Sequence, residues 1–326
     1  MPVFIPMTAL DTLGRRARLF PQSTGKRITL TERDVLWFAL LHEHGPLPSS
    51  YLHERTKDRW VSEKRAKERL TDLFNEANTP HEGPYLTRPL QQFRTIDSRY
   101  NELIYDLMPA AETALRAADR WRSHNARPSG PWLHGHMVAC ITASIELVAM
   151  ARADLTYVPG WRILERAGAE LRYPVTIADP TSGRQLTKYL IPDALFGLEY
   201  HTAAGSRFRF FVVEADRATE PLTSSNWNRK CVVRSFLQYE AYVCGARYNE
   251  HLKLTAPLLV LNVCSTAARA ERMRAALQKL RPGGMPYQLF QSWEGFGDVW
   301  RPQAMNRALL EGVWERVGGV GFGIDG

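Results

Sequence analysis

The chain has 326 residues, of which 44% are hydrophobic and 23% charged, and its formal net charge is +8. This length suits about two domains, because domains usually run to about 100–200 residues. The basic excess favours a polyanionic partner such as DNA, whereas 34 acidic residues exclude a histone-like coat of positive charge.

No segment of the sequence predicts secretion or a membrane span. The first residues, MPVFIPMTALDTLGRRARLF, lack the basic-then-apolar order of a signal peptide. The longest apolar stretch, residues 137–151, contains Thr, Ser and Glu and is shorter than the about 20 apolar residues that cross a bilayer. Four cysteines without CxxC spacing predict reduced thiols. A cytoplasmic protein without membrane contact is therefore expected.

After an N-terminal extension (residues 1–28), residues 29–123 are expected to form a first domain that begins with three helices. Thr31 with Asp34 three residues later predicts a helix N-cap before an apolar run. A short helix fits PLPSSYLHERT, and a third helix, capped by Ser62, fits SEKRAKERLTDLFNEAN. Its apolar residues recur at helical spacing and predict one buried stripe: Ala66, Leu70, Leu73 and Phe74.

The third helix carries a basic face. Lys64, Lys67 and Thr71 lie opposite the apolar stripe, with Arg65 on a flank. Two strand-like pieces follow, PYLTR and ELIYDLM, which completes the order of a winged helix, whose third helix enters the major groove of DNA. These four residues are therefore expected to contact double-stranded DNA. A solvated face balanced by neighbouring glutamates is the alternative interpretation.

Residues 88–101 would form the wing between the two strands. Arg88, Arg94 and Arg99 would contact phosphates, which set affinity and position without reading the base sequence. Winged-helix proteins often bind palindromes as dimers, so a homodimer is considered, although no coiled-coil heptad predicts one. The sequence SHNARPSGP (residues 123–131) is expected to be a linker.

The second domain is expected to span residues 132–290, followed by a C-terminal tail (residues 291–326), and to begin with an apolar helix. Glu146 is the only acid of this helix. A buried carboxylate is costly unless it is paired or bound to a metal, and an exposed helix edge is equally compatible. His134 and His136 diverge by about 200° on a helix, so they are not expected to chelate one metal together.

A strand near LRYPVTI and then a hairpin, residues 191–221, follow this helix. The hairpin carries two acids at positions where the alternating pattern of a strand expects apolar side chains: Asp193 and Glu214. If HTAAGS is the turn, Tyr200 pairs with Arg207 and the two acids are directly opposed, with Cβ atoms about 4.5–5.5 Å apart. Carboxylates this close repel unless a proton or a divalent cation lies between them, which favours Mg²⁺ or Mn²⁺. A one-residue slip of register would turn both acids to solvent.

A long helix, a buried strand and another helix complete the domain: SSNWNRKCVVRSFLQYEAYVCGARY, APLLVLNVCST and AARAERMRAALQKL. This order, with Pro-Asp on one strand and Glu-x-Asp on the next, resembles the PD-(D/E)xK nuclease core. Together with the winged helix, the string IPDALFGL…FFVVEADRATEP is similar to the replication-relaxation family of plasmids and other mobile elements. The implied fold is α+β or α/β: a winged helix-turn-helix domain followed by a mixed sheet flanked by helices.

The resemblance implies roles for individual residues. Asp193 and Glu214 would be catalytic and bind the metal, with Glu146 as an acid from the first helix. Position 216, where a nuclease of this group usually has lysine, is Asp216, which would be a further metal ligand or would cap the next turn. In some relatives the lysine lies on the following helix, which implies Lys230 as the third catalytic residue.

Two functions remain open from the sequence. The first is cutting or nicking of DNA with Mg²⁺ or Mn²⁺ by a replication protein of a plasmid or mobile element. The alternative is a non-catalytic, site-specific DNA-binding regulator of replication or transcription whose nuclease-like domain is degenerate.

Overall fold

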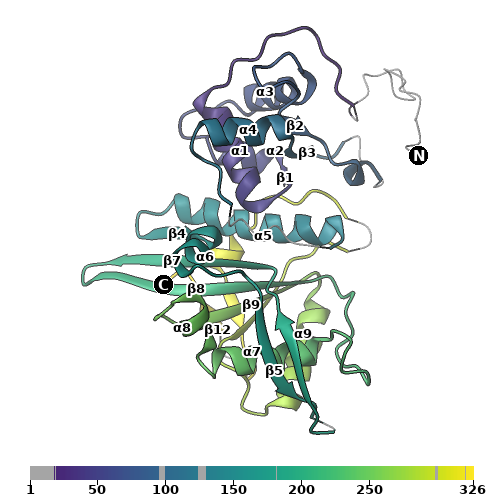
Figure 1. Cartoon of the computed structure of the whole chain (residues 1–326), viewed down its shortest axis with the longest axis vertical. Helices are drawn as coiled ribbons and strands as arrows, with labels where there is room; N and C mark the ends of the chain where they lie inside the picture. The colour runs from purple at the N-terminus through teal and green to yellow at the C-terminus, as the bar shows by residue number, and fades with distance from the viewer. Residues whose placement is uncertain are drawn as a thin grey trace. The chain divides into compact units, whose positions relative to one another are not determined.

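The computed structural model describes residues 18, 20–94, 100–123, 130–180, 182–297, 300–319 and 321–326 (Figure 1). The chain divides into two compact units. Unit 1 comprises residues 1–121 with 301–304, and unit 2 comprises residues 122–300 with 305–326. The division at residue 121 lies next to the linker expected from the sequence.

Unit 1 consists of short helices and a small antiparallel sheet. In chain order its elements are α1 (Glu32–His44), β1 (Leu47–Pro48), α2 (Ser49–Glu54), α3 (Glu63–Asn75), β2 (Leu86–Thr87), the 3-10 helix η1 (Leu90–Arg94), β3 (Ile104–Leu107) and α4 (Pro109–Ala117). β3 lies between β1 and β2 and pairs with both. This is the order of elements expected from the sequence, with β1 and η1 added.

Side-chain caps determine where α1 and α3 begin. Asp34 Oδ2 accepts a hydrogen bond from the Thr31 amide at 2.8 Å, and the Thr31 hydroxyl accepts one from the Asp34 amide, which completes a capping box. The Ser62 hydroxyl accepts from the Arg65 amide at 3.3 Å. Both predicted caps are confirmed. The predicted apolar stripe of α3 is buried, with Ala66, Leu70, Leu73 and Phe74 all nearly inaccessible.

Part of the expected N-terminal extension packs onto unit 1. Glu76, buried just after α3, accepts hydrogen bonds from the Ser23 hydroxyl at 2.6 Å and the Thr24 amide at 2.9 Å. Ile28 is also buried. The folded unit therefore begins before residue 29. Local sequence patterns did not reveal this, because Glu76 lies 53 residues from Ser23 and 52 residues from Thr24.

Unit 2 is a mixed α/β fold, which confirms the expected fold class. In chain order its elements are α5 (Trp132–Met150), β4 (Leu155–Pro159), α6 (Gly160–Ala167), β5 (Tyr173–Ala178), β6 (Gln185–Leu190), β7 (Ala194–Thr202), β8 (Gly205–Asp216), α7 (Val232–Val243), α8 (Arg247–Leu252), β9 (Leu258–Cys264), α9 (Ala267–Leu280), β10 (Gln288–Ser292), α10 (Ala308–Glu311), β11 (Val313–Glu315) and β12 (Gly321–Gly323).

Within the described residues, unit 2 contains a seven-stranded sheet with the order β12-β11-β10-β9-β8-β7-β4. The central strands β8, β9 and β10 are parallel, and the remaining pairs are antiparallel. α5 packs on β4, β7 and β8, while α9 packs on β9 and β10 (Figure 1). The parallel centre has the continuous apolar character typical of strands covered by helices, since β9 is buried along its whole length.

The β7–β8 hairpin has the predicted register. Tyr200 pairs with Arg207 and Ala194 pairs with Val213. The two strands continue further than expected, up to the pair Thr202 and Gly205, so the turn is shorter than the six residues assumed from the sequence. The change of turn length leaves the register unaltered, because both turns are centred on the same point of the chain.

Several elements of unit 2 differ from the expectation. The strand near LRYPVTI, β5, pairs with β6 in a separate two-stranded sheet, whereas the unpredicted β4 forms one edge of the main sheet. The segment expected to be a tail contributes α10, β11 and β12, and it buries Leu309, Leu310, Trp314 and Ile324. Strands of three residues in a glycine-rich segment are too short to show the alternation that predicts a strand.

α5 is the helix whose composition comes nearest to a membrane span. Its 19 residues are long and apolar enough by length and composition, and 72% of the apolar window is buried inside the structure. The sequence stretch expected to be too short for a span therefore lies within a longer helix. Its apolar residues form the core between this helix and the sheet, which accounts for the composition.

The start of α6 depends on the absence of a side chain at Gly160. A Cβ atom at this position would lie 2.2 Å from the Leu195 carbonyl oxygen on β7, a distance that requires the backbone to move. We expect Gly160→Ala to lower the free energy of unfolding by about 1–3 kcal/mol, as overpacking does, in urea denaturation followed by circular dichroism. Gly283→Ala is the matched control, because nothing lies within 4 Å of its Cβ. Equal stability of the two variants would contradict this account.

Candidate functional site

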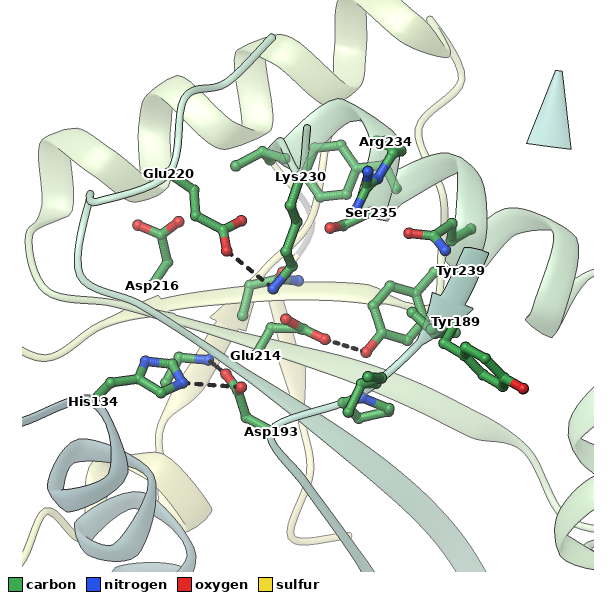
Figure 2. A pocket seen from close by; sticks show the side chains of 18 of the residues that line it. His134, Tyr189, Asp193, Glu214, Asp216, Glu220, Lys230, Arg234, Ser235 and Tyr239 are labelled. Carbon is green, nitrogen blue, oxygen red and sulfur yellow. Dashed lines mark hydrogen bonds and ion pairs between the residues drawn. The ribbon is translucent and has the colours of Figure 1, made fainter. Parts of the chain in front are cut away.

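A cavity of about 720 Å³ in unit 2 brings together the acids and the lysine singled out in the sequence. Asp193, Glu214, Asp216 and Lys230 all line it. Figure 2 shows Lys230 directed toward Glu214, with Asp193 close by and Asp216 further to the left beside Glu220. Asp193 directly precedes β7, the other two acids lie at the end of β8, and Lys230 lies in the loop before α7. The geometry of this cavity follows from the hairpin register, which places the two strand segments that carry the acids side by side.

Asp193 is fixed by contacts on both sides of its carboxylate. Its Oδ2 atom accepts a hydrogen bond from the Ala215 amide on β8 at 2.8 Å. Its Oδ1 atom lies 3.0 Å from Nε2 of His134, which donates when that nitrogen carries a proton. The Asp193 amide donates to the Val213 carbonyl at 3.0 Å. The carboxylate is therefore held at the edge of the hairpin and is only 16% exposed.

Glu214 occupies the less hydrated side of the cavity. Burial raises the pKa of Glu214 to about 8, and the neighbouring charge of Asp193 acts in the same direction, while Lys230 opposes the shift. The hydroxyl of Tyr239 on α7 donates a hydrogen bond to Glu214 Oε1 (Figure 2). Two facing carboxyl groups thus repel one another when both are ionised, and a cation between them would offset that repulsion.

Lys230 reaches the same cavity from the loop that precedes α7. Its ammonium group lies 3.0 Å from a carboxylate oxygen of Glu220. Burial lowers the pKa of Lys230, but the charges of Glu214, Glu220 and Asp193 outweigh it, so the net pKa is raised. The lysine therefore stays charged at neutral pH and contributes positive charge beside the two acids.

His134 belongs to this cavity, a role that the sequence patterns did not reveal. It lies in the first turn of α5, and its pKa is raised by the hydrogen bond to Asp193, against the effect of burial. His136, two residues later, is buried instead and stacks on Trp132 with ring centroids 5.1 Å apart. The two histidines point apart, in line with helix geometry. The sequence signal that could have indicated a role for His134 is its place as a polar residue in the first turn of an otherwise apolar helix.

Glu146 lies away from the cavity. It is half-buried on α5, twelve residues beyond His134, which corresponds to about 18 Å at 1.5 Å per residue. It is not among the residues that line the cavity. α5 contributes its first turn to the cavity, so the helix meets the site through His134, and the role of Glu146 as a metal-binding acid is not supported by its position.

Asp216 is held by a buried arginine of α9. Both of its carboxylate oxygens accept from Arg269, at 2.8 and 2.9 Å, and Oδ1 also accepts from the Ala218 amide at 2.7 Å. The same guanidinium donates to the Glu220 carbonyl at 2.7 Å. Asp216 thus neutralises Arg269 and caps the following turn. Arg269 therefore fixes the start of the loop between β8 and α7, in which the Glu220 side chain pairs with Lys230.

The donor atoms of the cavity fit a divalent cation of the Mg²⁺ type. Within the described residues, no group of three or more His, Cys, Asp or Glu side chains is placed to hold a metal ion. Two acids, Asp193 and Glu214, remain. Mg²⁺ is usually bound by one or two carboxylates and keeps several waters or substrate oxygens, and a pair of partly buried carboxylates beside an open cavity agrees with that mode. Mn²⁺ suits the same oxygen ligands.

The predicted DNA-binding residues of α3 lie on one exposed face of unit 1. Lys64, Arg65 and Lys67 are exposed, and Lys67 forms an ion pair with Glu63 at 2.7 Å. Thr71 is half-buried and accepts a hydrogen bond from Arg88 at 3.2 Å. The face is therefore available, although part of its charge is offset locally by glutamate.

The first arginine of the predicted wing, Arg88, does not have the role expected for it. Arg88 is buried, stacks over the Phe74 ring at 3.9 Å and donates to the Tyr105 hydroxyl at 3.0 Å. It therefore supports the core of unit 1 and is not available for phosphates as expected. Of the other two, Arg99 and the side chain of Arg94 lie outside the described residues.

The chain thus combines a helical first unit with a mixed α/β unit whose cavity is lined by acids and a lysine. The chain matches the model of the replication-relaxation family over residues 38–259 and belongs to that family. No curated protein and no solved structure matches it. The family assignment supports a role in the replication of a plasmid or other mobile element.

The contact between Arg269 and Asp216 is open to direct measurement. Both side chains are nearly buried, at 5% and 11% exposure. Because removal of one partner of a buried ion pair strands the other charge, we expect Arg269→Met to lower the free energy of unfolding by about 3–5 kcal/mol. Arg269→Met combined with Asp216→Asn should be less destabilised than the sum of the two single variants in a double-mutant cycle by urea denaturation. If the effects of the two single substitutions on the free energy of unfolding simply add, Arg269 and Asp216 are not energetically coupled.

Proposed function

We propose that this protein binds double-stranded DNA through α3 and cuts or nicks it in the cytoplasm with Mg²⁺ or Mn²⁺ held by Asp193 and Glu214. One observation carries the proposal: two carboxylates and a charged lysine line one cavity, although they come from three separate segments of the chain. Acids of this kind can hold a metal ion for phosphodiester hydrolysis, and a lysine beside them can stabilise charge on the phosphate.

The arrangement of unit 1 supports the DNA-binding part. Its helices and small sheet follow the winged-helix order, in which the third helix inserts into the major groove. α3 buries its apolar stripe and leaves Lys64, Arg65 and Lys67 exposed on the other side. A basic helix face presented by a packed unit provides electrostatic attraction to phosphates together with a fixed orientation.

Each residue of the cavity has a distinct part in the proposed reaction. A bound Mg²⁺ or Mn²⁺ would supply an activated water and neutralise charge on the scissile phosphate. His134 and the Ala215 amide orient the Asp193 carboxylate. Tyr239 orients Glu214. The Lys230 ammonium stabilises negative charge that develops on the phosphate oxygens, as a preorganised cation does in a partly desolvated site.

The position of Lys230 supports the idea that the lysine has moved along the chain. Asp216 takes the place where lysine would be expected and is engaged with Arg269. Lys230, fourteen residues later, enters the cavity from the opposite side and interacts electrostatically with both acids. A cation is thus restored to the cavity by a different segment.

One observation favours a second function, that of a non-catalytic DNA-binding regulator. Lys230 is paired with Glu220 at 3.0 Å. An ammonium group committed to a carboxylate offers less charge to a phosphate, so a degenerate cavity would bind a metal without promoting hydrolysis. The two functions share the DNA-binding unit and differ only in whether the cavity cuts.

The cleavage proposal is tested with supercoiled and linear DNA in the presence of Mg²⁺ or Mn²⁺. We expect wild-type protein to nick or cut, and Asp193→Asn, Glu214→Gln and Lys230→Met each to reduce the rate by at least about 100-fold, the scale of losing one electrostatic group from such a site. Glu146→Gln, outside the cavity, is the matched control and should keep its activity. DNA binding without any cleavage by the wild type would leave the regulator as the function.

The DNA-binding proposal is tested by the salt dependence of affinity. Each lysine that contacts a phosphate contributes about 1 to the slope of log K against log salt. We expect Lys64→Gln and Lys67→Gln each to reduce that slope by about 1 in fluorescence anisotropy titrations with duplex DNA. Lys279→Gln, an exposed lysine near the end of α9, removes the same charge elsewhere and should leave the slope unchanged. Identical slopes for all variants would refute the role of α3.

A further inference from the structure

Two arginines of unit 2 that do not line the cavity lie over the same aromatic ring. The guanidinium carbon of Arg209, on β8, lies 5.2 Å from the centre of the Phe322 ring, and that of Arg316, just after β11, lies 4.0 Å from it. Arg209 is five residues before Glu214 on the same strand. Because side chains alternate along a strand, Arg209 and Glu214 project from opposite faces, so these arginines form a separate site.

The two guanidinium groups lack acidic partners in the part of the chain that the structure describes. Neither forms an ion pair with a described carboxylate, and a buried N–H of each, at Arg209 Nη1 and Arg316 Nε, has no hydrogen-bond acceptor there. Asp325 of the neighbouring C-terminal segment is already engaged, because Arg152 binds it at 2.7 Å. Arg209 and Arg316 therefore contact aromatic rings, Phe322 for both and Tyr200 for Arg209, and form no ion pair with a described carboxylate.

This arrangement is costly as it stands. Burial lowers the pKa of Arg316, and the like charge of Arg209 lowers it further. An unpaired N–H in a partly buried position forfeits its hydrogen bond to water. The contacts are nonetheless held in place, because the Tyr200 hydroxyl on β7 donates to the Ile324 carbonyl and so fixes the segment that carries Phe322. A fixed pair of repelling cations is the feature that an anion would stabilise.

We propose that Arg209 and Arg316 form a binding site for phosphate groups of the DNA backbone. Guanidinium groups present planar N–H donors that match phosphate oxygens, often in pairs. Both side chains are half-buried, so one phosphate or two adjacent ones would bind their solvent-facing N–H donors and offset the repulsion between the two charges. The exposed Arg207 lies two residues before Arg209 on the same face of β8 and extends the positive charge along the hairpin. A row of cations along an exposed hairpin suits a polymeric anion better than a single small one.

The site adds a second DNA contact to the proposed function without depending on the reaction in the cavity. It rests on the proposed DNA binding only for the identity of the phosphate donor. Its position on unit 2 means that DNA affinity would not come from α3 alone. Recognition of phosphate and recognition of DNA are therefore tested separately.

The first test measures thermal unfolding of the full chain in inorganic phosphate and in chloride at equal ionic strength. We expect phosphate to raise the melting temperature of the wild type and to have no such effect on the Arg209→Gln/Arg316→Gln double variant. Arg316→Gln alone should melt no lower than the wild type in chloride, because it removes a repulsion. Arg162→Gln, an exposed arginine of α6, is the control and should keep the phosphate response. An equal phosphate response in wild type and double variant would overturn the site.

The second test measures duplex DNA binding against salt concentration in an Asp193→Asn background, which prevents cleavage. The double variant should lower the slope of log K against log salt by about 1 to 2, the value for one or two phosphate contacts, and Arg162→Gln should leave it unchanged. If the double variant loses the response to inorganic phosphate but keeps the wild-type slope with DNA, the site binds phosphate and DNA is not its ligand. If the wild type does not bind DNA at all, the assignment of DNA fails together with the proposed function, and a retained response to phosphate separates that outcome from failure of the site itself.

Discussion

The antiparallel register of β7 and β8 is the constraint on which the rest of unit 2 depends. It brings the start of β7 next to the end of β8, so that Asp193 and Glu214 meet. Gly197 helps to hold this register, because it pairs with Phe210 and a Cβ atom there would lie 2.9 Å from that aromatic ring. A slip by one residue would exchange the faces of every side chain on one strand. It would separate the two acids and drive a side chain into the place now filled by Phe210.

Local patterns predicted the parts of the structure whose causes are local. The caps at Thr31 and Ser62 are determined by residues three positions apart, and the hairpin register follows from the centre of the turn between the two strands, so both could be predicted from the sequence. The contact of His134 with Asp193 spans 59 residues and that of Arg269 with Asp216 spans 53. No periodicity links such distant residues, so these contacts required the fold. The three-residue strands of the C-terminal segment were missed because they are too short to carry a pattern.

Asp216, at the position where the resemblance led us to expect lysine, is held by a contact with α9. Asp216 with Arg269 forms a nearly buried ion pair that also holds the Glu220 carbonyl. A lysine at position 216 would face Arg269 and repel it, so the two positions are linked. The positive charge of the cavity then has to come from another segment, and Lys230 provides it. The acids of the cavity could be predicted from the sequence alone because they lie on the strands, whereas the placement of the cation depends on a contact made across the sheet.

The loop that carries Lys230 is closed at its base. Beyond the contact of Arg269 with Glu220, the Val232 amide donates to the Pro221 carbonyl at 3.1 Å and the Val233 amide donates to the Leu222 carbonyl at 3.0 Å. The entropy of closing the remaining loop rises only with the logarithm of its length, by about 0.6 kcal/mol per doubling. The end of the loop next to Lys230 is also held, because the buried Arg234 donates to the carbonyls of Trp227 at 3.3 Å and Asn228 at 3.0 Å. Residues added or removed before Trp227 therefore have little effect on the position of Lys230. The first part of this loop can therefore change in length while Lys230 keeps its place in the cavity.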